Sequence, residues 1–161
     1  MSIWKRCKWQ RRGTWLPAAG LGLALALASP AAAQDVAECD WRAAAQAIAE
    51  PWEDNTATFA NGAIRLAVMD VQEPAAGAYH LLILSPPRNE LGERQCRVMS
   101  ADGSFGFAGV SVAGATARYD PATGLTVSLS AKRSSGGDVF TDTVLHVTIN
   151  QATGAITGRL D

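Results

Sequence analysis

The sequence predicts a mainly β fold: an antiparallel meander of about seven or eight strands, forming a small barrel or a sandwich, with one short N-terminal helix. After residue 55, apolar residues alternate with polar ones with a period of two, most regularly over residues 125–131. Short segments that begin with a polar residue and end in glycine separate these stretches. Such segments favour hairpin turns, so successive strands are expected to pair.

The first 33 residues are expected to form a secretory signal peptide that is cleaved between Ala33 and Gln34. Residues 1–12 are basic, residues 16–28 form an uncharged apolar run, and a proline and small residues precede the cleavage point. The alternative is a membrane anchor. The apolar run of 13 residues is shorter than the roughly 20 that a helical span needs.

Cleavage would leave a single domain, residues 34–161, without a stable membrane span, in the periplasm or outside the cell. The pair Arg11-Arg12 leaves general secretory and twin-arginine export both open.

Residues 34–161 contain nine basic and fifteen acidic side chains, a net charge of -6, which argues against nucleic-acid binding. An apolar content of 48% and a charged content of 18% exclude a disordered chain.

Two cysteines remain after cleavage, Cys39 and Cys96. An even number of cysteines in an exported protein predicts one disulfide, here closing a separation of 57 residues. The alternative is a catalytic or metal-binding thiol. Neither cysteine has an adjacent histidine or a Cys-x-x-Cys spacing, which such a site would favour.

The expected helix covers residues 40–49, in an alanine-rich stretch. Asp40 can cap its N-terminus and Pro51 ends it. Trp41 and Ile48 fall on one helical face, together with two alanines, and this face is expected to pack on the sheet.

The expected strands begin with the alternating residues 64–68. Residues 79–84 are nearly all apolar, which predicts a central strand buried on both faces. Further strands are expected at 94–99, around Phe105 and Phe107, and at 125–131, 145–149 and 156–160. Turns are expected at residues 73–77, 120–124 and 150–154, and Asn61-Gly62 is a strong signal for a tight turn into the strand at 64–68. A softer turn signal lies at residues 134–137.

Two histidines, His80 and His146, are the candidates for general acid–base chemistry. No His-x-His or His-x-x-x-His spacing indicates a metal site, and no serine lies in a Gly-x-Ser-x-Gly turn. Both histidines are therefore interpreted as strand residues. The carboxylates near Trp52 and in the 85–95 loop are interpreted as surface charges, although a glycosidase would need two such groups across a cleft.

The loop after the buried strand is the candidate binding surface. Pro86 and Pro87 stiffen it, Arg88 and Glu90 are displayed, and Cys96 would anchor its far end. The alternative is a plain strand connection that the prolines keep ordered. No glycine-rich phosphate loop leads from a strand into a helix, so no nucleotide or other cofactor is expected.

Several segments resemble a group of small secreted proteins of Gram-negative bacteria that have no assigned activity. The segments are 59–67, 73–78, 84–87, 94–96 and 119–125. The resemblance spans most of the expected domain and implies export. It supplies no cofactor and no active-site residue.

Two hypotheses for the function follow. The first is a non-catalytic periplasmic module that binds a protein partner or a small ligand in the cell envelope. The second is a small hydrolase that uses dispersed carboxylates or a histidine. A pocket that brings His80 or His146 within hydrogen-bond reach of an acid and a nucleophile would favour the hydrolase. A filled interior with an exposed apolar rim or loop patch would favour the binding module.

Overall fold

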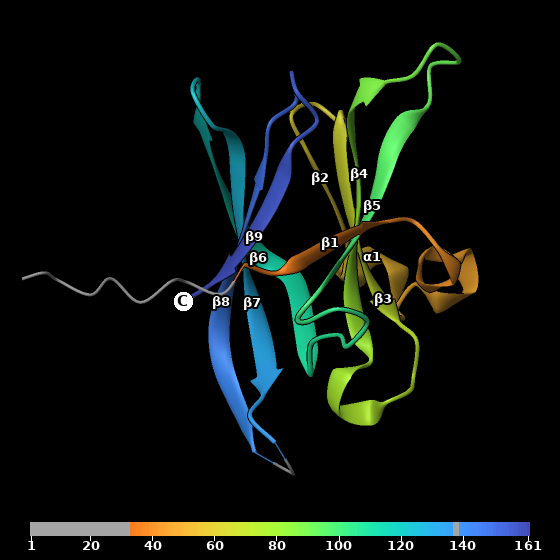
Figure 1. Cartoon of the computed structure of the whole chain (residues 1–161), viewed down its shortest axis with the longest axis vertical. Coiled ribbons are helices and arrows are strands. Elements are labelled where there is room, and N and C mark those ends of the chain that lie inside the picture. Colours follow the sequence, from red (N-terminus) through yellow and green to blue (C-terminus); the bar gives the residue numbers. More distant parts are fainter. Residues whose placement is uncertain (1–32, 137–138) are drawn as a thin grey trace, which may run out of the picture.

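The computed structural model describes residues 33–136 and 139–161, and in them nine strands form two antiparallel sheets that face each other (Figure 1). Residues 1–32 of the expected signal peptide, and Gly137 of one expected turn, lie outside the described residues. The prediction of a mainly β, antiparallel fold is confirmed. The two sheets form a sandwich and do not close into a barrel.

The five-stranded sheet has the order β1-β5-β4-β3-β2. Strands β2 to β5 are a meander, and β1 adds to the edge of β5. The bounds are β1 Asp35–Glu38, β2 Thr56–Phe59, β3 Ile64–Asp70, β4 Tyr79–Arg88 and β5 Arg94–Ser100. The sequence signals did not predict β1, whose four residues are too short to show a period.

The four-stranded sheet is a second meander, in the order β6-β7-β8-β9. Its bounds are β6 Gly109–Asp120, β7 Gly124–Ser134, β8 Phe140–Ile149 and β9 Ile156–Leu160. Asp120 and Asn150 open the β6–β7 and β8–β9 hairpins, and their side-chain oxygens accept hydrogen bonds from the two turn amides that follow. The turns predicted at 120–124 and 150–154 are thus confirmed, by the Asx-turn chemistry.

The core lies between the two sheets and is built from the alternating residues. Leu125, Val127 and Leu129 of β7 point into it, and so do Leu81 and Ile83 of β4. On the other face of β4, Leu82 and Leu84 pack beneath residues 39–48. The prediction that this strand is buried on both faces is confirmed.

The helix expected at residues 40–49 is not confirmed. The segment forms two single 3-10 turns, Trp41–Ala43 and Ala45–Ala47, separated by an extended Ala44. Ile48 forms a bridge with Met69 and the Ala49 N–H bonds to the Val68 carbonyl at 2.9 Å, so the end of the segment pairs with β3 instead of continuing a helix. A ten-residue helix is marginal in isolation, and this pairing with the sheet outweighs its propensity.

Two further expectations change with the structure. Trp41 does not pack on the sheet, since 67% of it is exposed. The segment around Phe105 and Phe107 is not a strand of either sheet. It crosses from one sheet to the other, and Phe107 exchanges two backbone hydrogen bonds with Tyr79, of 3.1 and 2.7 Å. The short helix α1, Trp52–Asn55, lies before β2.

Candidate functional site

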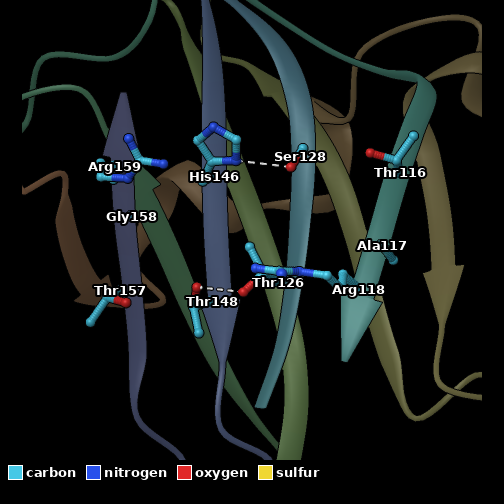
Figure 2. A pocket seen from close by; sticks show the side chains of 10 residues that line it. All are labelled: Thr116, Ala117, Arg118, Thr126, Ser128, His146, Thr148, Thr157, Gly158 and Arg159. Carbon is cyan, nitrogen blue, oxygen red and sulfur yellow. Dashed lines mark hydrogen bonds between the residues drawn. The ribbon is translucent and has the colours of Figure 1, made fainter. Parts of the chain in front are cut away.

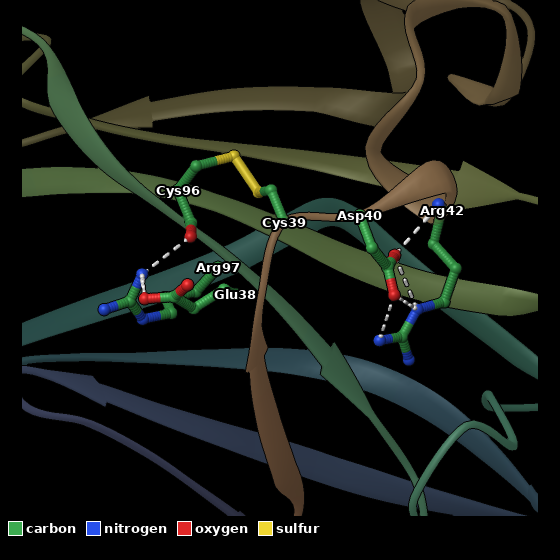
Figure 3. The surroundings of a disulfide bond; sticks show 6 residues. All are labelled: Glu38, Cys39, Asp40, Arg42, Cys96 and Arg97. Carbon is green, nitrogen blue, oxygen red and sulfur yellow. Dashed lines mark hydrogen bonds and ion pairs between the residues drawn. A yellow bond between two sulfur atoms is a disulfide. The ribbon is translucent and has the colours of Figure 1, made fainter.

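Cys39 and Cys96 form the predicted disulfide, with their Cα atoms 5.4 Å apart (Figure 3). Cys96 lies on β5, so the bond fastens residues 39–48 to the outer face of the five-stranded sheet. A disulfide of this kind indicates an oxidising, extracytoplasmic environment. The described residues contain no helix long and apolar enough to cross a membrane.

Beside the disulfide lies a partly buried polar network that includes the buried residues Arg42, His80 and Ser100. Arg42, which is 6% exposed, binds the Asp40 carboxylate at 2.9 Å and donates through Nη1 to the Ser100 hydroxyl, also at 2.9 Å. His80 Nδ1 lies 2.9 Å from the same hydroxyl and the side chain is 1% exposed. Burial lowers the pKa of His80, and the Arg42 charge lowers it further. His80 is therefore a neutral structural residue, as interpreted from the sequence.

This network predicts a loss of stability in mild acid. Because the folded pKa of His80 lies below its ordinary value of 6.5, the unfolded chain binds a proton more readily than the folded chain below pH 6.5. The contribution of His80 to the free energy of unfolding is expected to be constant well above pH 6.5 and to fall as the pH decreases through that value. Urea unfolding at a series of pH values measures how the free energy of unfolding depends on pH.

The matched variant is His80→Gln, which cannot titrate and can still accept a hydrogen bond from Ser100. Its free energy of unfolding should depend less on pH near 6.5 than that of the wild type. The low pKa of Asp40, held down mainly by its hydrogen bond from Arg42, acts only below 3.8 and leaves this range undisturbed. Equal pH slopes in the two proteins would contradict the assignment.

The predicted binding loop is an ordered end of the β4–β5 hairpin. Pro86 is half-buried, whereas Pro87, Arg88 and Glu90 are exposed. Gln95 donates through Nε2 to the Pro86 carbonyl at 2.8 Å and to the Gly154 carbonyl at 3.0 Å, which ties the loop to the β8–β9 turn. These hydrogen bonds therefore hold the loop in place in addition to the two prolines. The binding role of the loop stays a prediction.

Positive charge gathers at this end of the five-stranded sheet. Arg88 and Arg94 are direct cross-strand partners. Arg94 donates to the carbonyls of Gly62 and Ala63, and its pKa is lowered by desolvation and by the nearby charges of Arg88 and Arg65. The cluster of Arg65, Arg88 and Arg94 is therefore chemically suited to bind an anion.

The carboxylates noted in the sequence do not build a second site. Glu50, Glu53 and Asp54 are exposed around α1, and Glu90 is exposed in the loop. Within the described ranges, no group of three His, Cys, Asp or Glu side chains could hold a metal ion. Trp52 lies beside them and is 51% exposed.

The structure reveals a different site, on the outer face of the four-stranded sheet (Figure 2). Because the residues of β7 and β8 that face the core alternate with outward ones, the outward side chains of all four strands align in rows across the sheet. Two of these rows together form what we call the polar face. The first row is Thr116, Ser128, His146 and Arg159, and the second is Arg118, Thr126, Thr148 and Thr157.

The polar face lines a hollow of about 620 Å³. It carries five hydroxyl groups, two guanidinium groups and one imidazole, and Figure 2 shows Arg118 extending over β7 toward Thr126 and Thr148. The hydroxyls of Thr126 and Thr148 lie 2.9 Å apart. Among the described residues, Arg118 has no ion-pair partner, so its charge is available to a ligand.

Ser128, His146 and Asp161 form a continuous chain of hydrogen bonds at the rim of the hollow. The Ser128 hydroxyl lies 2.8 Å from His146 Nδ1, and Asp161 Oδ2 lies 2.8 Å from His146 Nε2. Asp161 also pairs with Arg159. The hydrogen bond from His146, followed by that from Arg159, lowers the pKa of Asp161, so this carboxylate is ionised.

This chain is chemically capable of moving a proton. With its Nε2–H directed at Asp161, a neutral His146 can accept the Ser128 hydroxyl proton at Nδ1. However, β7 and β8 are the two central strands of the sheet, so their backbone N–H groups donate hydrogen bonds to the neighbouring strands on both sides. Backbone donors for a developing oxyanion are therefore not supplied by the strands that carry Ser128 and His146.

Sequence reasoning missed this face as a site. The period of two placed Thr126, Ser128 and Thr148 on an outward side, but it could not show which residues of the other strands lie opposite them. Asp161 is brought to His146 by its backbone N–H, which bonds to the Val144 carbonyl at 3.1 Å, and by Thr143, which donates to its carbonyl. No motif in the sequence carries that information.

Comparisons of the chain with protein-family models, with curated proteins and with solved structures found no match. The chemistry of the site is therefore the evidence for function.

Proposed function

We propose that the protein is an exported, non-catalytic binding module of the Gram-negative cell envelope, with its ligand site on the polar face. The observation that carries the proposal is the alignment of eight side chains in two complete rows over a hollow of about 620 Å³. This volume is in the range of small-molecule sites. The predicted signal peptide and the disulfide support export, to the periplasm or beyond it.

The chemistry of the polar face favours a hydroxyl-rich anion, such as a sugar that bears a phosphate or a carboxylate. Hydroxyl side chains both donate and accept hydrogen bonds, as sugar hydroxyls require. Guanidinium groups bind carboxylate and phosphate oxygens in pairs of hydrogen bonds. Arg118 is the principal anchor, because Arg159 is partly neutralised by Asp161.

Glucose 6-phosphate and galacturonate are the probes, with glucose as the neutral comparison. We expect the two anionic sugars to shift the NMR signals of Thr126, Ser128 and Thr148, and glucose to bind more weakly. Arg118→Gln should weaken binding of the anionic sugars by roughly ten-fold or more, since it removes a charged hydrogen bond. Calorimetric titration measures the dissociation constants.

Arg133→Gln is the matched control. Arg133 is an exposed arginine of β7, in the same sheet and outside the hollow, so its loss should leave binding unchanged. Signals that shift only at Arg88 and Arg94 would move the site to the predicted loop and overturn the assignment to the polar face. Absence of binding by both anionic sugars would overturn the proposed ligand class.

The Ser128–His146–Asp161 chain favours a second candidate function, a small hydrolase. Ser128 Oγ would attack the carbonyl carbon of an ester while His146 accepts its proton, the bond from that carbon to the alcohol oxygen would break, and the alcohol would leave with the proton from His146. Water would then hydrolyse the acyl group from Ser128. Hydrolysis of a nitrophenyl ester and covalent labelling with a fluorophosphonate, compared between the wild type and Ser128→Ala, distinguish the two functions. The binding proposal expects no difference between them, whereas turnover and labelling that require Ser128 would replace it with the hydrolase.

A further inference from the structure

Gln34 lies at the seam between the two sheets. Figure 1 shows the segment that leads into β1 crossing from β9 to the five-stranded sheet. Ala33 forms a bridge with Arg159, and the Gln34 N–H donates to the Gly158 carbonyl at 3.1 Å. One residue later, β1 begins to pair with β5. Gln34 is thus held by backbone pairing on β9, and it is also the first residue that the expected cleavage would leave.

The side chain of Gln34 is buried, and its amide oxygen Oε1 has no hydrogen-bond partner among the described residues. The residue is 8% exposed. Gly158 leaves room for it, because a Cβ at Gly158 would lie 2.9 Å from Gln34 Cβ and 2.7 Å from Met99 Sδ. The Gln34 carbonyl oxygen therefore loses no hydrogen bond when this amide reacts.

A charged N-terminus would fit this position poorly. Gly158 presents one carbonyl to the nitrogen of Gln34, which matches one N–H. An α-ammonium group has three N–H bonds and a positive charge, and the neighbouring residue of β9 is Arg159. Loss of that charge, and of the surplus donors, would leave the observed hydrogen bond intact.

We propose that Gln34, once it is the N-terminal residue, is converted to pyroglutamate. The neutral α-amine attacks the side-chain Cδ, a bond from nitrogen to Cδ forms, and the bond from Cδ to Nε2 breaks. The amide nitrogen leaves as ammonia and carries away a proton of the amine. The step involves no oxidation and no cofactor, and the lactam retains a single N–H for the Gly158 carbonyl. The inference rests on the proposed cleavage between Ala33 and Gln34.

Intact-mass measurement of the full chain after expression and export tests the inference. We expect the mass of residues 34–161 less two hydrogens for the disulfide and less one ammonia, with an N-terminus blocked to Edman degradation. The Gln34→Ala variant should have a free α-amine and should lack the loss of ammonia. A wild-type product that begins at Gln34 with a free α-amine would overturn cyclisation and leave the export proposal standing.

A product that still bears Met1, or begins at another residue, would overturn the cleavage and the cyclisation together. A second measurement tests the position of the ring. Pyroglutamyl aminopeptidase should release the ring from denatured, reduced protein and not from the folded protein, because the seam covers it. Equal release from both would show that the ring does not occupy the seam.

Discussion

Removing the disulfide is expected to lower the free energy of unfolding by about 4 kcal/mol, from the chain entropy of the separation that it closes. Cys39 and Cys96 are 57 residues apart, and the bond also holds residues 39–48 over Ala67, Met69 and Leu82. Without it, this segment can leave the outer face of the sheet and expose an apolar surface. Urea unfolding of the oxidised and reduced protein measures the difference.

The Cys39→Ser/Cys96→Ser variant provides the control. It should unfold at the same urea concentration as the reduced wild type, and a reducing agent should not change it further. If the oxidised protein and the double variant unfold at the same midpoint, the bond does not stabilise the fold and the outer segment is held by its other contacts.

Phe107→Ala is expected to destabilise the fold by about 3–5 kcal/mol, the usual cost of removing a buried aromatic ring. Phe107 is fully buried, and its backbone is hydrogen-bonded to Tyr79 where the chain crosses between the sheets. The variant leaves a cavity where the two sheets are connected, so neither sheet can relax alone to fill it. Chemical unfolding followed by tryptophan fluorescence and circular dichroism measures the change.

Phe105→Ala is the matched control, two residues earlier in the same crossing. Phe105 is 39% exposed and contacts Gly77 from the surface, so its removal should cost clearly less than removal of Phe107. Equal losses of stability would show that the crossing segment, and not the core position of Phe107, determines the effect.

The strands and hairpins that depend on local chemistry could be predicted from the sequence. The alternation of β7, the apolar run of β4 and the Asx turns at Asp120 and Asn150 each act within a few residues, so they are visible without knowledge of the fold. The expected helix failed for the opposite reason. The end of this segment pairs with β3, and helix propensity, which depends on the local sequence alone, takes no account of a contact with a distant strand.

The candidate site could be predicted only in part. The sequence indicated outward polar residues on β7 and β8, and it indicated His146 as a possible proton carrier. It did not indicate a role in a site for Ser128, Arg118 or Asp161, because that role depends on which residues the cross-strand register places beside them. If one strand were shifted by one residue relative to its neighbour, its side chains would point to the other face of the sheet and neither row would form.

By itself the sequence predicted the antiparallel β class and the pairing of its two cysteines within residues 34–161, both of which are confirmed, whereas the routing of the chain stays a prediction. These follow from composition, from a period of two and from the presence of only one possible pair. The tertiary structure decided that the sheets form a sandwich, that Gln34 lies buried in its seam, and that Ser128, His146 and Asp161 meet. The physical reason is that a hydrogen-bond ladder joins residues far apart in the chain, and no local pattern records which residues it joins.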